Sequence, residues 1–205
     1  MNPVLDARPI IVALAGSNGA GKTTFFHAHL AHSGLRFINP DQLQRELGGT
    51  ADDAAQAATA LRRTLVLQRE SFVFETVLSD PVGDKLGFLE QAAADGYTVV
   101  LIFIGMGSAE LCDERVAMRV LQGGHDVAAA RVAARYPRTL ENLARAIAKL
   151  PVVLVFDNSD LEQPYRKVAE YTHGKVIYLA APAPAWLPGG QLPRLTSPLK
   201  KRMAP

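Results

Sequence analysis

The stretch that decides the fold is "IIVALAGSNGAGKT", residues 10–23. Its first part, residues 10–15, is a continuous apolar run, which is typical of a strand buried on both faces of a parallel sheet. Residues 16–23 match G-x-x-x-x-G-K-[ST] in full, and a helical pattern begins at residue 21. A buried strand, a glycine-rich turn and a helix in this order predict a loop that binds the phosphates of a nucleoside triphosphate.

Each residue type in this loop has a physical role. Glycines let the backbone curl so that its N–H groups point at phosphate oxygens. Lys22 is expected to reach the β- and γ-phosphates, and the Thr23 hydroxyl is expected to ligate Mg²⁺. The residues expected to bind the nucleotide are Gly16, Ser17, Asn18, Gly19, Ala20, Gly21, Lys22, Thr23 and Thr24.

The type of nucleotide-binding protein is narrowed by what the sequence lacks. The N-K-x-D motif, by which GTPases usually read guanine, is absent from the sequence. A chain of 205 residues is also short for a mechanical ATPase. We therefore interpret the chain as a small kinase.

Composition and charge argue against several other classes. With 48% hydrophobic and 20% charged residues, the chain has the composition of an ordinary globular protein. A formal net charge of +2 is too small to indicate a nucleic-acid partner. The single cysteine, Cys112, excludes a disulfide framework and is interpreted as a small packed residue, which fits a cytoplasmic protein. No apolar run approaches the roughly 18 residues that span a membrane.

Strand and helix patterns alternate along the chain, which predicts an α/β fold. We expect a central parallel sheet of about five to six strands, flanked by helices, in one P-loop kinase domain over residues 1–180. Residues 181–205 contain six of the 13 prolines and no acidic residue, so we expect a basic, extended C-terminal arm. The expected strands are 10–15, 36–39, 71–76, 98–105, 152–157 and 175–180. The expected helices include 51–70, 81–94, 108–121, 126–135 and 138–149.

Three acidic residues lie at or just after the ends of predicted strands, namely Asp41, Glu75 and Asp157. Because ligands gather at the carboxyl ends of parallel strands, these side chains are candidates for the reaction site. A kinase needs a carboxylate near the acceptor hydroxyl to orient it and take its proton. Asp41 also suits a helix N-cap, and a buried Glu75 would need a ligand or a hydrogen-bond donor. Asp157 ends an apolar run as a Walker B acid does, but the "DNS" that it begins favours a turn.

Residues 114–136, "ERVAMRVLQGGHDVAAARVAARY", are rich in arginine and poor in acidic partners. Arg115 and Arg119 are four residues apart, so they share a helix face and can both point at one polyphosphate. Arginines over a phosphoryl group in transfer can raise the rate by about 10³ or more. We therefore expect a helical lid over about 108–136, with Gly123-Gly124 as its hinge.

The other arginines of this region have a simpler interpretation. Arg131 and Arg138 flank an alanine-rich segment, and we favour a solvated basic face for both. For Arg135, a tether of the lid and a contact with the nucleotide are equally open. His125 is interpreted as a hinge-packing or hydrogen-bonding residue.

Taken in order, these residues resemble those of the zeta-toxin-like P-loop kinases, in particular the short bacterial members. The resemblance covers about residues 9–160. It rests on "AGSNGAGKTTF", "FINPD", "FVFETVLSDP", "GY", "RVAMRVLQGGHDV", "ARYPRTLENL" and "FDNS", in that order. The phosphate-binding loop alone is generic, whereas the ordered series is much more specific.

The resemblance implies an ATP- and Mg²⁺-dependent kinase that phosphorylates the sugar 3′-hydroxyl of UDP-N-acetylglucosamine or of a related nucleotide sugar. It implies that Asp41 is the base and that Glu75 and Thr76 help to hold the substrate. Arg115 matches the arginine of the family's "ER" pair, and Arg119 is expected to be the second phosphate-binding arginine. Larger relatives are toxins neutralised by a small helical antitoxin, which makes such an antitoxin a candidate partner.

Two other functions stay open at the level of sequence. An RNA-end or tRNA kinase is favoured only by the basic tail, because the body lacks a basic stripe with interleaved aromatic residues. A nucleotide-binding partner module would bind ATP without transferring its phosphate to any hydroxyl.

Overall fold

The central sheet is parallel through five strands and ends in an antiparallel pair. In the computed structural model, which describes residues 3–121, 123 and 126–189, the strand order is β2-β3-β1-β4-β5-β6-β7. The first five strands of this order, β2-β3-β1-β4-β5, are parallel to one another. β6 is antiparallel to β5, and β7 is antiparallel to β6. The strands are β1 (Ile10–Ala15), β2 (Arg36–Ile38), β3 (Phe72–Thr76), β4 (Thr98–Gly105), β5 (Val152–Asp157), β6 (Arg166–Thr172) and β7 (Lys175–Leu179).

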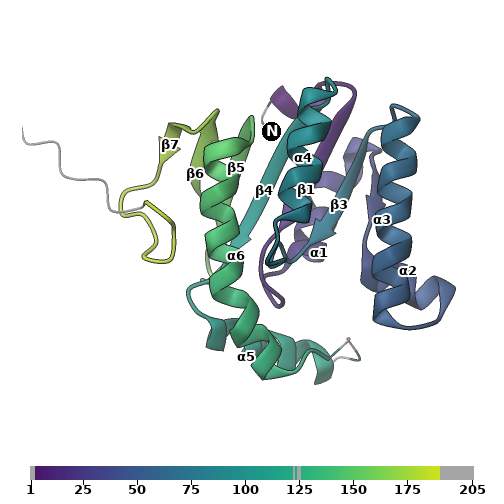
Figure 1. Cartoon of the computed structure of the whole chain (residues 1–205). Helices are drawn as coiled ribbons and strands as arrows, with labels where there is room; N and C mark the ends of the chain where they lie inside the picture. Colours follow the sequence, from purple (N-terminus) through teal and green to yellow (C-terminus); the bar gives the residue numbers. More distant parts are fainter. Residues whose placement is uncertain (1–2, 122, 124–125, 190–205) are drawn as a thin grey trace, which may run out of the picture.

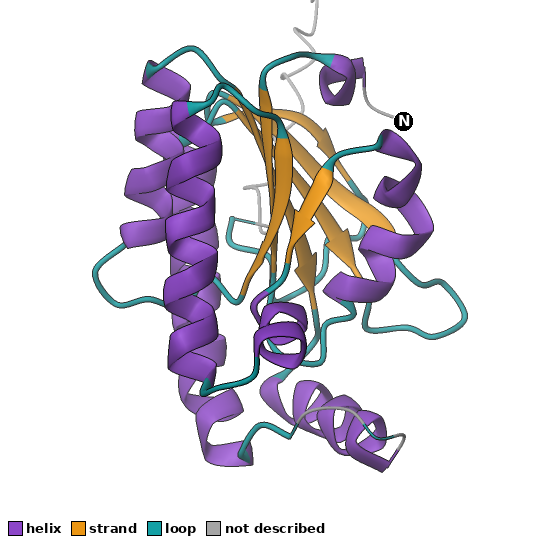
Figure 2. Cartoon of the chain, turned by 90° about the vertical axis from the view of Figure 1, so that its right-hand side faces the viewer, coloured by secondary structure: helices purple, strands orange, loops and turns teal. Residues whose placement is uncertain are grey.

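Helices cover both faces of this sheet (Figures 1 and 2). Helices α3, α4 and α6 pack on one face, and α1 with α5 packs on the other. A short π-helical segment, Phe26–Leu30, continues α1. The helices are α1 (Lys22–Phe25), α2 (Pro40–Leu47), α3 (Ala51–Leu67), α4 (Asp84–Ala94), α5 (Ala109–Leu121) and α6 (Ala129–Lys149). Among the described residues, no helix is both long and apolar enough to cross a bilayer.

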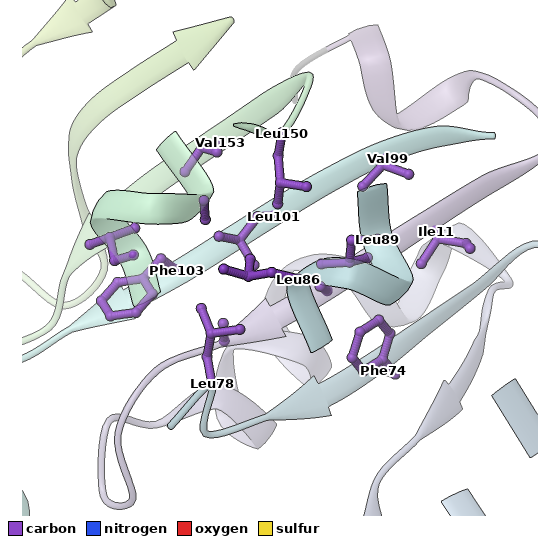
Figure 3. Close-up of a cluster of buried hydrophobic side chains, with 14 of the residues drawn as sticks. Ile11, Phe74, Leu78, Leu86, Leu89, Val99, Leu101, Phe103, Leu150 and Val153 are labelled. Carbon is purple, nitrogen blue, oxygen red and sulfur yellow. The ribbon is translucent and has the colours of Figure 1, made fainter. Parts of the chain in front are cut away.

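The core is divided by the sheet into two apolar layers, and β1 contributes to both. All six residues of β1 are buried, because successive side chains of a strand point to opposite faces. Ile11 and Ala13 pack with the layer under α4 and α6, part of which Figure 3 shows, whereas Val12 and Leu14 pack with the layer under α1 and α5. The continuous apolar run of β1 is therefore explained, and the predicted α/β fold is confirmed.

The sheet contains one strand that the sequence pattern did not indicate. β6 reads "RKVAEYT", and its charged residues hide the strand pattern. Val168 and Tyr171 are nevertheless buried, and Lys167 forms an ion pair with Glu170 at 2.5 Å. β6 pairs with β5 and carries β7, so the sheet has seven strands.

The predicted break at Pro137 is wrong, because the segments 126–135 and 138–149 belong to one helix, α6. Proline removes one N–H from a helix, and the resulting cost can be offset by packing. Val132 and Leu143, on either side of the proline, are both buried in the core. The Thr139 hydroxyl also donates to the Arg135 carbonyl at 3.0 Å, a local bond that accommodates a bend.

The described beginning of the C-terminal arm packs on the body. Leu187 is buried with the layer under α4 and α6, and the ring of Trp186 lies 6.2 Å from that of Phe103. A Cβ added to Gly105 would lie 2.0 Å from the Trp186 ring, so the indole rests directly on the end of β4. The expected extended arm from residue 190 onward lies outside the described residues.

Candidate active site

The phosphate-binding loop follows β1 and is held in a shape that requires glycine. Gly16 has a φ of 143°, and a Cβ there would lie 2.2 Å from the Ile104 carbonyl oxygen. Gly19 has a φ of 78°, and a Cβ there would lie 2.3 Å from the Cys112 carbonyl oxygen. Such contacts exclude a side chain, so the loop is closely packed against β4 and α5.

Lys22 is folded into this loop. Its side chain is only 5% exposed, and its ammonium donates to the Ser17 carbonyl oxygen at 3.0 Å. The same ammonium lies 3.5 Å from Oε1 of Glu75. A buried ammonium that contacts both the loop backbone and a carboxylate is positioned to meet the phosphates that the loop would cradle.

Glu75 is the acidic centre of the site. Its Oε2 accepts hydrogen bonds from the Thr23 hydroxyl at 2.8 Å and from the Asn39 side-chain amide at 2.9 Å. β3 lies directly beside β1, with Glu75 in register with Leu14. The structure therefore brings together the predicted residues Lys22, Thr23 and Glu75.

This cluster fits Mg²⁺. Hydroxyl and carboxylate oxygens are the ligand types that Mg²⁺ prefers, and it usually binds one or two carboxylates together with water and substrate phosphates. The Thr23 hydroxyl and the Glu75 carboxylate, 2.8 Å apart, would hold the ion beside Lys22. No other protein ligand is needed for this type of site.

Asn39 is a site residue that the sequence analysis did not identify. It is 4% exposed, and its amide oxygen accepts hydrogen bonds from the backbone N–H groups of Asp41 at 2.8 Å and Gln42 at 3.3 Å. Asn39 is thus the N-cap of α2, with Pro40 at the first helical position. The signal was present, because proline at that position marks the preceding residue as the cap.

Asp41 is placed beside the cluster by this cap. Its carboxylate is exposed at the first turn of α2, while its own N–H is bound by the Asn39 amide that also contacts Glu75. The alternative that Asp41 itself caps the helix is wrong, because Asn39 does so. Asp41 is free to face an acceptor, and its role as the base stays a prediction.

Thr76 and Asp157 have structural partners. The Thr76 hydroxyl accepts the Leu78 N–H at 3.1 Å and so shapes the loop after β3. Asp157 ends β5, which is separated from β1 by β4. One of its oxygens accepts the Ser159 N–H at 3.1 Å, and the other pairs with Arg166 at 3.6 Å. The interpretation of "DNS" as a turn is confirmed.

The arginines of α5 are not equivalent. Arg115 is half-buried, and its guanidinium donates to the Ser159 carbonyl oxygen at 3.4 Å. A Cβ on Gly19 would lie 3.4 Å from the Cβ of Arg115, so this arginine begins directly beside the phosphate-binding loop. Arg119 is half-buried one turn further along α5. Their action on phosphates stays a prediction.

The arginines of α6 form a second group. Arg131 is exposed, as expected of a surface residue, and Arg135 is half-buried. Burial lowers the pKa of Arg135, and the neighbouring charges of Arg131 and Arg138 lower it further. Of the predicted hinge, Gly123 has a φ of 83°, while Gly124 and His125 lie outside the described residues.

Two residues from the segment between β5 and β6 support the phosphate-binding loop. The buried Asn158 amide donates to the Ala20 carbonyl oxygen at 2.9 Å, and its oxygen accepts the Tyr165 N–H at 3.3 Å. The Tyr165 hydroxyl donates to the Gly21 carbonyl oxygen at 3.0 Å. We refer to Asn158 and Tyr165 as the latch. The latch is not predictable from the sequence, because no local pattern connects residues so far apart in the chain.

Cys112 does not take part in this chemistry. It is fully buried, and burial raises the pKa of its thiol to about 11. A thiol with such a pKa is protonated at neutral pH and is a poor nucleophile. Its interpretation as a small packed residue is confirmed.

The family model described as "Zeta toxin" matches residues 3–170. The chain belongs to the zeta toxin family. The predicted family resemblance is therefore confirmed, and a zeta-toxin-like P-loop kinase domain is the setting for the cluster around Glu75. Comparison with curated proteins gave no match.

Several solved structures have the same fold as this chain. The AvrRxo1-ORF1:-ORF2 complex has 21% sequence identity and a TM-score of 0.61, with 84% of this chain and 62% of that chain covered. The PezAT toxin-antitoxin system of Streptococcus pneumoniae has 18% identity and a TM-score of 0.57, with 80% and 72% covered. A Chloroflexus aurantiacus protein has 20% identity and a TM-score of 0.54, with 76% and 88% covered. At these identities the likeness concerns the fold.

Proposed function

We propose that this zeta toxin family protein is an ATP-dependent kinase. It would transfer the γ-phosphoryl group to a hydroxyl of UDP-N-acetylglucosamine or of a related nucleotide sugar. The observation that carries the proposal is the contact between Glu75, Lys22, Thr23 and Asn39, which joins the phosphate-binding loop to the helix that bears Asp41. One AvrRxo1-ORF1 structure was determined with ATP, which supports ATP as the donor.

In this proposal the site residues divide the tasks of phosphoryl transfer among them. Lys22, moving from Glu75 and the Ser17 carbonyl to the triphosphate, would neutralise charge on the β- and γ-phosphates. Thr23 and Glu75 would hold Mg²⁺, which when bound supplies positive charge to the phosphate oxygens. Asp41 would accept the proton of the attacking hydroxyl. Arg115 and Arg119 would face the equatorial oxygens of the group in transfer.

Substrate binding follows from the same arrangement. Asp41 at the start of α2 and Thr76 at the end of β3 flank the carboxyl edge of the sheet, where ligands of parallel α/β proteins bind. We propose that these two residues, with Glu75, contact the sugar nucleotide. A kinase that draws on ATP and nucleotide sugars would act in the cytoplasm.

The proposal is tested by phosphoryl transfer from γ-labelled ATP to a panel of nucleotide sugars. Asp41→Asn should reduce kcat by about 10²–10⁴, the usual contribution of a general base, without changing the thermal unfolding temperature. Asp52→Asn, an exposed acid on the neighbouring α3, is the matched control and should retain full turnover. Near-wild-type turnover of Asp41→Asn would show that the base is another group.

A second variant tests the phosphate-binding loop. Lys22→Ala should abolish transfer to every acceptor, while Lys149→Ala, which removes an exposed lysine paired with Glu90, should not. If the wild-type chain binds ATP but labels no acceptor in the panel, the nucleotide-sugar proposal fails and the partner-module alternative is favoured.

We also propose a protein partner of the antitoxin type. AvrRxo1-ORF1 was solved as a complex with ORF2, and PezAT is a toxin-antitoxin system. Expression of this chain alone should inhibit growth, and co-expression with a short helical reading frame next to its gene should restore it. Inhibition that persists in Lys22→Ala would separate the growth effect from kinase activity and refute the toxin mechanism.

A further inference from the structure

A groove of about 440 Å³ lies between α3 and α4, away from the site described above. Its floor includes Phe74 and Phe88, which belong to the apolar layer under α4 and α6. The phosphate-binding loop leads into α1, which packs with the opposite layer. Phe74 and Glu75 are successive residues of β3, so they point to opposite faces of the sheet.

The groove contains a buried arginine. Arg62 is only 7% exposed, and its guanidinium lies over the rings of Phe74 at 4.9 Å and Phe88 at 5.9 Å. Among the described residues it donates one hydrogen bond, to the Thr59 hydroxyl at 2.9 Å. Within the described part of the chain, no carboxylate lies within ion-pair distance of it.

An arginine in this position is short of partners. A guanidinium has five N–H donors, and burial of a charge is costly unless the charge is paired and hydrogen-bonded. Burial, followed by the charge of Arg63, lowers the pKa of Arg62 to about 10. The two phenylalanine rings compensate in part through cation–π contacts, and within the described part of the chain Thr59 is the protein acceptor for the guanidinium.

The charges around Arg62 favour a negative ligand. Arg63 and Lys85 also line the groove, and Asp84 is the acidic residue there. Among the described residues, neither Arg63 nor Lys85 forms an ion pair. The lining therefore carries three positive charges and one negative charge. Arg62, the most buried of the three cations, lies against the two phenylalanine rings.

We propose that this groove is an anion-binding site that takes the phosphate or carboxylate group of a small molecule, with Arg62 as its principal ligand. The planar fork of a guanidinium matches such groups with two parallel hydrogen bonds. Packing against the rings of Phe74 and Phe88 restricts where the guanidinium can lie before the ligand arrives. Arg63 and Lys85 add long-range attraction at the rim.

The test uses inorganic phosphate as the probe and the full chain in isothermal titration. Lys22→Ala serves as the background, so that phosphate bound in the nucleotide site does not contribute. Phosphate should bind with a millimolar dissociation constant. Arg62→Met should weaken binding by about tenfold or more, because the loss of about 1.4 kcal/mol corresponds to that factor. Arg45→Gln, an exposed arginine of α2, is the matched control and should bind phosphate unchanged.

A second variant keeps the test decisive if Arg62→Met does not fold. Arg63→Gln combined with Lys85→Gln alters only the rim and should still weaken phosphate binding and reduce its dependence on salt. Absence of phosphate binding in the Lys22→Ala background, or equal affinity in the groove variants and the control, would overturn the proposal.

One further arm distinguishes the source of the anion. If UDP-N-acetylglucosamine displaces phosphate in competition, the groove holds an anionic part of the acceptor. If phosphate and UDP-N-acetylglucosamine bind at the same time, the groove is a separate site for a free anion. Both results support an anion site, and neither depends on phosphoryl transfer, so failure of the kinase proposal would be recognised separately.

Discussion

Replacement of Asn158 by alanine is the sharpest test of how the phosphate-binding loop is supported. The Asn158 amide donates to the Ala20 carbonyl oxygen at 2.9 Å and accepts the Tyr165 N–H at 3.3 Å. Ala20 is fully buried, so no water can replace the lost donor without rearrangement of the loop. The variant removes one side of the latch and leaves the main chain of the loop without its partner.

The magnitude follows from these two contacts. A buried polar group left without its partner costs about 1–3 kcal/mol, and the longer bond to Tyr165 belongs at the lower end of that range. We expect Asn158→Ala to lose about 3 kcal/mol of unfolding free energy in total. For a domain of this size, each kcal/mol lowers the unfolding temperature by about 2–4 °C, so the expected decrease is about 6–12 °C.

The assay is thermal unfolding followed by circular dichroism, with and without Mg-ATP. ATP should stabilise the variant less than it stabilises the wild type, because a loosened loop binds the nucleotide more weakly. Asn158→Asp should be at least as destabilised, since it places a carboxylate against the Ala20 carbonyl. Ser159→Ala, which loses only a hydroxyl contact with Asp157, is the local control. If Asn158→Ala and Ser159→Ala unfold at the same temperature, the latch does not support the loop.

Two further predictions concern other parts of the molecule. Asn39→Ala should lower the unfolding free energy by about 1 kcal/mol through the lost helix cap, and it should also lower the rate of phosphoryl transfer. Asn39→Asp should retain the cap but lose the hydrogen-bond donor to Glu75. Equal transfer rates in the wild type and both variants would contradict the role of the amide. Trp186→Ala should lower the unfolding free energy in denaturant by about 2 kcal/mol or more, because the ring packs on Gly105 and Phe103. Leu161 has a side chain that is 75% exposed, so Leu161→Ala should change the unfolding free energy little. An equal effect of Trp186→Ala and Leu161→Ala would refute the packing argument.

The parts of the site that were predictable are those encoded by local pattern. The stretch 10–23 determines a strand, a loop and a helix start within a few residues, and the structure has them there. Glu75 was identified because it ends a strand, and the parallel order of β1 and β3 then brings it to Thr23. The positions of these residues follow from the local sequence and from the rule that the carboxyl ends of parallel strands meet at one edge of the sheet.

The parts that were missed depend on long-range geometry. Asn158 reaches Ala20 across 138 positions, and nothing in the turn that contains it indicates a distant carbonyl. The continuity of α6 through Pro137 was missed for another reason. Local propensity predicts a break at a proline, but burial of Val132 before it and of Leu143 after it outweighs this propensity.

The antiparallel pair at the end of the sheet determines where the chain can be shortened. β5 pairs with β4 on one side and with β6 on the other. A protein cut before Arg166 would expose the backbone edge of a strand that reads "VVLVFD", and an open apolar edge is a template for aggregation. The matched family region ends at residue 170, inside β6. A stable shortened form should therefore retain β7 and continue past Leu187, whose burial completes the core.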